Sequence, residues 1–260
     1  MKALVKLGGA LLENAELQSH IAEQLARAAG DHQIVVVHGG GKQVTRFLEE
    51  RGVRSRFVNG LRVSDENVID AVTKVIAGSV NKHLVSALTA AGVSAVGLSG
   101  LDGGLTRAAQ LNPDLGFVGT PSATDGRLFE LLLAAGYMPV IACVGGDARG
   151  NIYNVNADQM AVSCAAGWNA DRLIFLTDVP GVKGEDGAVI AQLATGDINR
   201  LIASGVVSGG MQAKLEAGRL AVQHGVDEVI VASGQECDIC TRLFSGAELG
   251  TRLTGEAFAA

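Results

Sequence analysis

The 260-residue sequence predicts an α/β fold, a three-layer αβα sandwich on a mainly parallel central sheet. The first observation is an alternation along the chain between short runs rich in Val, Ile and Leu and longer segments with helical periodicity. The second is that the short runs are apolar throughout, which is typical of parallel strands covered by helices on both faces. These expected strands occupy residues 3–7, 34–37, 93–98, 139–144, 172–177 and 228–232.

Six segments carry the periodicity of amphipathic helices, with apolar residues three or four positions apart. Several of them end on a glycine, which is a common helix stop because glycine adopts the left-handed conformation easily. The expected helices occupy residues 16–30, 44–52, 64–92, 126–136, 157–169 and 211–225.

Two segments interrupt the alternation and predict hairpins or loops at the ligand-binding edge of the sheet. Residues 101–125 and 145–156 are broken by glycines and by prolines or aspartates. A boundary near residue 170 divides the chain into an N-terminal lobe, 1–170, and a C-terminal lobe, 171–260.

Composition and charge favour small molecules as binding partners. The formal net charge is −6 and the pI is about 5.4, which argues against a surface for nucleic acid or for an anionic membrane. The apolar stretch at the N-terminus is interrupted by Lys6 and two glycines, so it fits neither a signal peptide nor a membrane span. We therefore expect a cytoplasmic protein.

The four cysteines do not form a recognisable metal or redox motif. Cys237 and Cys240 make a single CxxC pair, whereas a structural zinc site needs a second pair of ligands. We interpret them as ordinary thiols near a helix start. Cys143 and Cys164 lie in apolar surroundings and are expected in the core.

Two glycine turns follow expected strands, "KLGG" after 3–7 and "HGGGK" after 34–37. The second is not a Walker A loop, because Val36 stands where that motif needs glycine and Gln43 follows Lys42. The sequence contains neither the G-x-S-x-G of esterases nor the G-x-G-x-x-G of dinucleotide sites. Parallel strands end at the same edge of a sheet, so both turns can face one anion-binding crevice.

Five polar residues are candidates for that crevice, although each has a structural alternative. Burying the charge of Lys6 in an apolar strand costs free energy, unless its ammonium group meets an anion or reaches solvent. Arg62 could hold a carboxylate or form a surface ion pair. Asn156 is a natural helix N-cap and Asp158 lies in the first helical turn, so helix capping alone accounts for Asn156 and in part for Asp158. Capping does not explain Asn154.

These motifs, in their order along nearly the whole chain, resemble the amino-acid kinase family. They are "VKLGGALL", "VVVHGGGKQV", "NGLRVS", "AGSVNKHLV", "GLSGLDG", "GYMPVIACVG", "YNVNADQMA", "LIFLTDVPGV", "GGMQAKL" and "GTRL". The resemblance implies that the N-terminal lobe binds an amino-acid derivative and the C-terminal lobe binds ATP. It also implies a homodimer joined through the long helix from about 65 to 91.

The resemblance assigns three groups of site residues. It implies that Lys6 and Lys214 stabilise the transferring phosphoryl group and that Asp158 orients them. Lys42 is expected to be a solvated residue on the helix after the second glycine turn. The implied substrate contacts are Gly40, Gly41, Arg62 and Asn154. The implied nucleotide contacts are Gly8, Gly9, Asp178, Val179, Pro180, Gly181, Val182, Lys183, Val206, Val207 and Ser208.

Within the family, the motifs most resemble the branch that phosphorylates the side-chain carboxylate of N-acetyl-L-glutamate with ATP, a step of arginine biosynthesis. A carboxylate is already ionised at neutral pH, so the reaction needs no general base. The cofactor is Mg²⁺ carried by the nucleotide, and no metal-binding residues are assigned to the protein.

Two alternatives stay open, a kinase for carrier-protein-linked α-aminoadipate, which belongs to lysine biosynthesis, and a ligand sensor without catalysis. Residues 101–125 contain Arg107 opposed by three aspartates, which disfavours an acidic carrier protein. Members inhibited by arginine carry an extra helix before the first strand. Because this strand begins at residue 3, we expect no arginine inhibition and a dimer rather than a ring of dimers.

Overall fold

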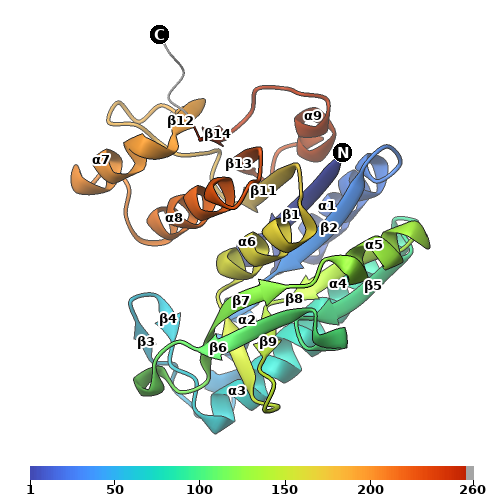
Figure 1. Ribbon diagram of the computed structural model, residues 1–260, viewed down its shortest axis with the longest axis vertical. Helices are drawn as coiled ribbons and strands as arrows, with labels where there is room; N and C mark the ends of the chain where they lie inside the picture. Colours follow the sequence, from blue (N-terminus) through green and yellow to red (C-terminus); the bar gives the residue numbers. More distant parts are fainter. Residues whose placement is uncertain (256–260) are drawn as a thin grey trace.

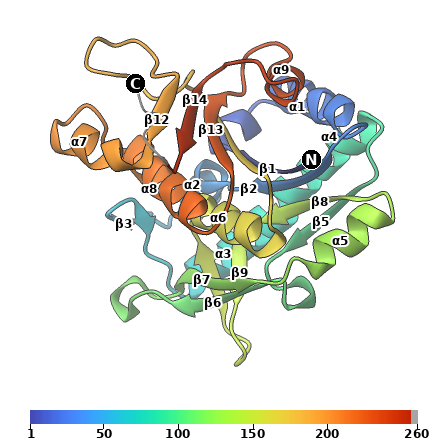
Figure 2. The ribbon, with the colours of Figure 1, turned by 45° about the horizontal axis from the view of Figure 1, so that its top comes forward.

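The computed structural model describes residues 1–255 and contains a central sheet of eight strands, which curves through the molecule in Figures 1 and 2. The strand order is β12-β14-β13-β11-β1-β2-β8-β5. All neighbours are parallel except β13 and β14. The strands are β1 (Lys2–Leu7), β2 (Gln33–His38), β5 (Ala95–Ser99), β8 (Met138–Ala142), β11 (Arg172–Thr177), β12 (Gln192–Ala194), β13 (Glu228–Ser233) and β14 (Thr251–Thr254).

Helices cover both faces of this sheet, so the predicted three-layer αβα sandwich is confirmed. Helix α1 packs on α4 and α9 on one face, while α6 packs on α8 on the other (Figure 2). Phe129 of α5 meets Trp168 of α6 edge-on. The helices are α1 (Ala15–Ala28), α2 (Gly41–Glu49), α3 (Glu66–Val72), α4 (Asn81–Ala90), α5 (Arg127–Ala134), α6 (Ala157–Trp168), α7 (Ile198–Ala203), α8 (Gly209–Gln223) and α9 (Ile239–Phe244). Short 3-10 turns are η1 (Gly9–Leu12), η3 (Asp102–Gly104), η4 (Pro113–Leu115) and η5 (Thr195–Asp197).

The expected long helix is a continuous helical run from residue 66 to 90 with a π-helical middle. The π segment, η2 (Thr73–Val80), joins α3 to α4. π-helical turns inside α-helices are frequent at functional sites. Dimerisation through this run stays a prediction.

The two interrupted segments form a second, smaller unit of sheet. Strands β6 (Thr106–Gln110), β7 (Val118–Thr124), β9 (Val144–Gly146) and β10 (Ile152–Val155) close into a four-stranded barrel. Within it, β6 pairs with β7 and β9 with β10 as antiparallel hairpins, as the loop chemistry predicts. A separate short hairpin joins β3 (Phe57–Val58) to β4 (Leu61–Arg62).

The predicted boundary near residue 170 coincides with the end of a helix. Helix α6 ends at Trp168, its C-cap Asn169 has a left-handed φ of 52°, and the chain then enters β11. The sheet itself is continuous there, because β1 pairs with β2 on one side and with β11 on the other. The division into lobes 1–170 and 171–260 stays a prediction, and residues 256–260 lie outside the described part of the chain.

Among residues 1–255, no helix combines the length and the apolar character that a membrane span requires.

All four cysteines are free thiols, and three of them are inaccessible. Burial raises the pKa of Cys143, Cys164 and Cys240 to about 12, whereas Cys237 is exposed. Because the thiolate is the reactive form, we expect a disulfide reagent at about pH 8 to label one thiol per folded chain rapidly. Unfolding in urea should make the other three thiols accessible to the reagent, and Cys237→Ser should abolish the rapid phase. Rapid labelling of two thiols in the folded protein would contradict the buried position of Cys240.

Candidate active site

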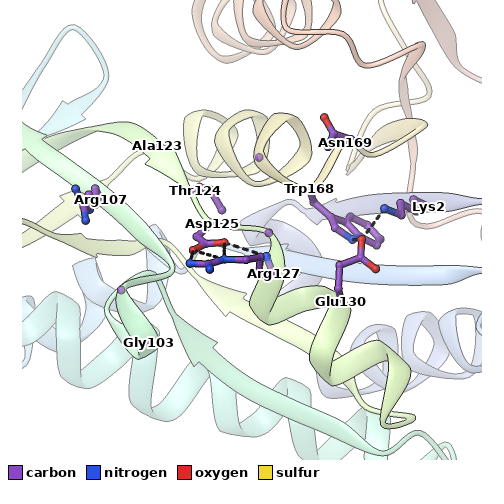
Figure 3. Close-up of a pocket in the computed structure, with 13 residues that line it drawn as sticks. Lys2, Gly103, Arg107, Ala123, Thr124, Asp125, Arg127, Glu130, Trp168 and Asn169 are labelled. Atoms are coloured by element: carbon purple, nitrogen blue, oxygen red, sulfur yellow. Dashed lines mark hydrogen bonds and ion pairs between the residues drawn. The ribbon is translucent and has the colours of Figure 1, made fainter.

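One cavity of about 680 Å³ lies between the start of α5, the end of α6 and the β6–β7 hairpin (Figure 3). Its charged groups largely neutralise each other: Lys2 pairs with Glu130 and Arg127 with Asp125. It shares no lining residue with either glycine turn. The glycine motifs of the sequence therefore do not belong to this cavity.

A smaller cavity of about 230 Å³ lies where both glycine turns meet, beyond the carboxyl ends of β1 and β2. Its floor comes from the central sheet, and its walls come from α2, the β3–β4 hairpin, η2 and the barrel. The lining residues are Lys6, Gly9, Gly39, Gly40, Gly41, Val44, Phe57, Gly60, Leu61, Arg62, Val72, Ile76, Val118, Cys143, Asn154, Val155, Asn156 and Ala157. The lining contains two cationic side chains and no carboxylate, so the cavity suits a small anion.

Lys6, Asp158 and Lys214 come together beside this cavity from three different elements. Lys6 lies on β1 with 5% of its surface exposed, and its Nζ is 2.6 Å from Asp158 Oδ1. Lys214 extends from α8, and its Nζ donates to Asp158 Oδ2 at 3.2 Å. One carboxylate thus holds two ammonium groups, as the family resemblance implies.

The local sequence explains why Asp158 occupies this place. Asn156 is the N-cap of α6, and its side chain accepts hydrogen bonds from the N–H groups of Asp158 and Gln159 at 2.9 and 3.2 Å, which confirms the predicted cap. Asp158 therefore lies in the first helical turn, where the helix dipole favours a negative charge.

The two lysines keep the Asp158 carboxyl ionised. Burial pushes its pKa upward, but the ammonium groups of Lys6 and Lys214 outweigh that effect and hold the pKa below its usual value. Asp158 Oδ1 has no well-aligned hydrogen-bond donor among the described residues, although Lys6 is close. The Lys6 contact is therefore an ion pair rather than a directed hydrogen bond.

This shift predicts how Asp158→Asn changes stability with pH. A folded-state pKa below the unfolded value of about 3.9 stabilises the fold above that pH, and the stabilisation disappears as the pH falls through the folded-state pKa. At pH 7 we expect the variant to lose roughly 3–5 kcal/mol, because two poorly solvated ammonium groups lose their partner. Urea unfolding from pH 7 to pH 3 should show this difference shrinking below about pH 4. A difference that grows in acid would contradict the lowered pKa.

The residues expected to contact the substrate line one cavity. Gly40 and Gly41 begin α2, Arg62 ends β4, and Asn154 lies on β10. Asn154 Nδ2 donates to the Ser64 hydroxyl at 3.1 Å, which fixes the amide against the wall of the cavity. Segments far apart in the sequence thus supply the walls of one cavity.

Arg62 is a buried cation whose partners are all neutral. It is 7% exposed and donates to the Gly41 carbonyl at 2.6 Å, to the Thr45 hydroxyl at 2.8 Å and to the Ser55 hydroxyl. Phe57 stacks against it with the guanidinium carbon 4.7 Å from the ring centre. Burial lowers its pKa, and within residues 1–255 no carboxylate pairs with it. A buried cation of this kind attracts an anionic ligand.

The two glycines of the first turn, Gly8 and Gly9, have different surroundings. The Gly8 N–H donates to the Leu176 carbonyl at 2.8 Å, so it is occupied by the neighbouring strand. A side chain at Gly8 would meet that carbonyl oxygen at 3.1 Å, which explains the glycine by close packing. Gly9 has open space around it and lines the cavity, so it is the residue of this turn that can face a ligand.

The expected nucleotide segments lie in the C-terminal half of the chain. Residues 178–183 leave the carboxyl end of β11, and 206–208 lead into α8, whose N-cap is Ser208. Val182 is fully buried, and a side chain at Gly181 would meet Val189 and Thr251 within 3 Å. These two residues therefore pack the body of the lobe and can reach a ligand only through their backbone. Asp178 and Lys183 are exposed.

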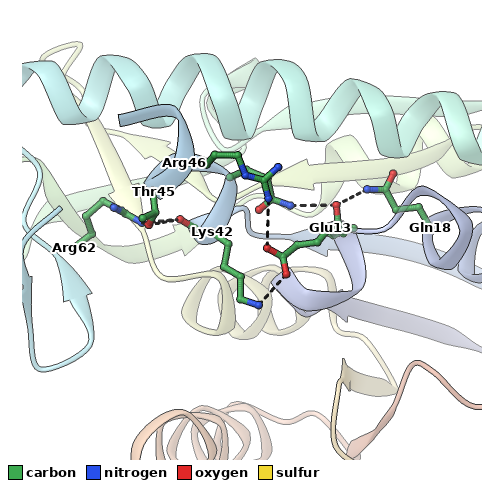
Figure 4. Close-up of polar contacts among 9 residues, drawn as sticks. Glu13, Gln18, Lys42, Thr45, Arg46 and Arg62 are labelled. Atoms are coloured by element: carbon green, nitrogen blue, oxygen red, sulfur yellow. Dashed lines mark hydrogen bonds and ion pairs between the residues drawn. The ribbon is translucent and has the colours of Figure 1, made fainter. Parts of the chain in front are cut away.

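Lys42 is confirmed as a solvent-exposed residue of α2, and it ties the two glycine turns together (Figure 4). Its Nζ is 2.8 Å from Glu13, just after η1, and that hydrogen bond raises the pKa of Lys42. Gln18 and Gln43 both donate to the Leu12 carbonyl. The turn after Gly9 is thus anchored to the helix that follows Gly41.

Several residues that line this cavity could not be identified as site residues from the sequence. Phe57, Val72, Ile76 and Val118 form the apolar wall of the cavity, but their types are those of ordinary core residues. The one available signal is the position of Phe57, five residues before Arg62 in a glycine-containing hairpin.

The fold and this site define a phosphoryl-transfer enzyme, and comparison with known proteins agrees. The sequence profile of the amino acid kinase family matches residues 1–233, and the chain belongs to that family. The protein is therefore a kinase.

Two similar relatives are both named acetylglutamate kinase. The one from Solibacter usitatus is 52% identical over 255 residues, covering 97% of this chain and 99% of the relative. The one from Acidobacterium capsulatum is 45% identical over 257 residues, covering 96% and 99%. The solved structure of smu.665 from Streptococcus mutans matches with a TM-score of 0.83 at 27% identity over 98% of both chains.

Proposed function

We propose that the protein transfers the γ-phosphoryl group of ATP to the side-chain carboxylate of N-acetyl-L-glutamate, giving N-acetyl-L-glutamyl 5-phosphate and ADP. The observation that carries this proposal is Arg62, a buried cation that has no acidic partner among residues 1–255, in a cavity that also contains Lys6 and both glycine turns. The similarity to two acetylglutamate kinases supports the same substrate. The activity belongs to arginine biosynthesis.

The cavity matches a small dicarboxylate in size and polarity. Its volume of about 230 Å³ lies below the roughly 300–1,000 Å³ of pockets for drug-sized ligands. Arg62 would hold one carboxylate through its positive charge and the N–H groups that Gly41, Thr45 and Ser55 leave free, and Asn154 would contact the acetylated amine. The second carboxylate would then face Gly40 and Gly41, near Lys6.

The chemistry requires charge stabilisation rather than proton removal. The attacking carboxylate has a pKa near 4.3 and is ionised at neutral pH, so an oxygen lone pair attacks the γ-phosphorus while the bond to ADP breaks. Lys6 and Lys214 would stabilise the charge on the phosphoryl oxygens, and Asp158 keeps their ammonium groups close together. Bound to the nucleotide, Mg²⁺ would neutralise part of the phosphate charge.

We assign the nucleotide to the C-terminal side of the site. Residues 178–183 and 206–208 would contact ATP there, and Gly9 would face its phosphates. Lys214 of α8 supports this arrangement, because it extends from the C-terminal half of the chain to the same carboxylate as Lys6. The two substrates would thus approach Asp158 from opposite sides.

One assay tests the proposal directly. Purified protein is incubated with ATP, Mg²⁺ and N-acetyl-L-glutamate, and hydroxylamine traps any acyl phosphate as a hydroxamate. We expect hydroxamate and ADP in equal amounts, both dependent on N-acetyl-L-glutamate. If only carrier-linked α-aminoadipate gives product, that compound is the substrate and the assignment of N-acetyl-L-glutamate is wrong. Calorimetric binding of N-acetyl-L-glutamate without turnover would indicate a sensor.

A further inference from the structure

His38 is the last residue of β2, directly before the three glycines, and it lies outside the cavity lining. It is fully buried, with one ring nitrogen, Nδ1, 2.8 Å from the Gly39 carbonyl oxygen. The other, Nε2, is 3.0 Å from Asn81 Nδ2. Both ring nitrogens are therefore engaged, one by the glycine turn and one by the helix behind it.

The partners of Asn81 determine where the imidazole proton resides. Asn81 Nδ2 also donates to the Val140 carbonyl at 3.0 Å, and its Oδ1 accepts from the Lys82 ammonium at 3.0 Å. The amide nitrogen thus faces His38 as a donor, and Nε2 must accept. A neutral imidazole then carries its proton on Nδ1 and donates it to Gly39.

The ring stays neutral over the ordinary pH range. Burial lowers the pKa of His38 to about 4, although the hydrogen bond to Gly39 favours the charged form and Lys82 opposes it. One fixed tautomer is therefore available at any pH where the enzyme works.

The glycine turn is supported on its other sides as well. A side chain at Gly40 would lie 3.2 Å from Ile76 and 3.3 Å from Val80, both in η2. A side chain at Gly39 would lie 3.3 Å from the Ala157 methyl group at the start of α6. Asn81 directly follows η2, so the π-helical segment brings both the apolar support and the amide to the turn.

We propose that His38 is a positioning residue for the phosphoryl acceptor: held by Asn81, it fixes the Gly39 carbonyl and thereby aims the Gly40 N–H into the cavity. In a trans peptide the C=O of one residue and the N–H of the next point in opposite directions, and the described chain has no cis bond. Since the Gly39 carbonyl points at the buried ring, the Gly40 N–H points away from it, toward the acceptor. The assignment rests on the proposed function for the identity of that acceptor.

Two matched variants separate the two ring nitrogens. In His38→Asn the side-chain amide nitrogen replaces Nδ1 and can still donate to Gly39, whereas in His38→Gln the amide group replaces Nε2 and the contact with Gly39 is lost. We expect kcat/KM for N-acetyl-L-glutamate to fall about 10–100-fold in His38→Gln, because an oriented donor is lost. In His38→Asn it should fall by less than about fivefold, and KM for ATP should change little in either.

His224, which is exposed just after α8, provides the control, and His224→Gln should leave all constants unchanged. Each histidine variant at position 38 loses one ring contact, so a purely structural role predicts equal losses in the two. Equal losses, or a loss shared equally between KM for ATP and KM for the acceptor, would overturn the proposal.

A measurement on the unaltered protein covers the case in which a variant does not fold. Nitrogen NMR of protein labelled in its five histidines should show one ring with Nδ1 protonated and Nε2 bare, unchanged from about pH 5.5 to 8.5. A protonated Nε2 at His38 would overturn the proposal. If the wild type makes no hydroxamate from N-acetyl-L-glutamate, the proposed function fails, and this NMR signature still tests the position of His38.

Discussion

Lys214→Ala is expected to lower kcat by about 10²–10³, equivalent to about 2.7–4 kcal/mol of transition-state stabilisation, with small changes in KM for both substrates. The reason is that charge on the phosphoryl oxygens develops as the bond to ADP breaks, and a preorganised ammonium group stabilises that charge best at this stage. Lys214 lies 3.2 Å from Asp158 and is only partly exposed, so water replaces it poorly. Steady-state kinetics with the hydroxamate assay measures the effect.

Lys2→Ala is the matched control, because Lys2 lies at the opposite end of β1 from Lys6 and forms an exposed pair with Glu130. Exposed ion pairs contribute little, so this variant should keep its activity. Near-normal turnover in Lys214→Ala would show that Lys214 only balances the charge of Asp158. A Tm measurement on both variants excludes unfolding as the cause.

Arg62→Ala is expected to lower kcat/KM for N-acetyl-L-glutamate by about 30-fold to about 4 × 10³-fold, mainly through KM, while KM for ATP stays nearly constant. Truncating one partner of a buried, hydrogen-bonded charge pair typically costs about 2–5 kcal/mol, and each 1.4 kcal/mol is tenfold. Arg62 contacts the Gly41 carbonyl and lines the cavity that we assign to the phosphoryl acceptor, so the effect should be confined to that substrate.

Arg54 supplies the control, since it is an exposed arginine in the segment that leads into the same hairpin. Arg54→Ala should change neither KM. Equal increases in the two KM values for Arg62→Ala would indicate a collapsed site rather than a lost contact, and an unchanged KM for N-acetyl-L-glutamate would remove Arg62 from the acceptor site.

The strands of the central sheet could be predicted from sequence because their signal is local. Residues 172–177 were expected and β11 is Arg172–Thr177, and the expected 34–37 lies within β2. The barrel could not be predicted to the same degree. Its closure depends on pairing between β10 and β7, which are joined only after the chain has passed through α5 and β8, and non-local pairing leaves no periodic trace in the sequence.

In the candidate site, too, the residues could be predicted from sequence motifs but their contacts could not. The motifs around Lys6, Asp158 and Lys214 predict residues that act on phosphate, but they do not predict how these residues are arranged. Asp158 and Lys214 are 56 residues apart in the chain, and their contact exists because α6 and α8 pack on the same face of the sheet. Likewise, "NGLRVS" left open whether Arg62 forms a surface ion pair, and the structure shows a buried guanidinium with neutral partners.

The α/β class, the main strands and helices, the two glycine turns and the family resemblance could all be predicted from the sequence, because each of these is encoded in local periodicity or in short motifs. Three features became visible only in the folded chain: the Gly8 N–H is occupied by Leu176, His38 donates to Gly39, and Arg62 lines a cavity with no acidic partner in the described part of the chain. The physical reason is that hydrogen-bond direction and charge compensation depend on which distant side chains and backbone groups surround a residue, and that environment is created only when the sheet and its covering helices assemble.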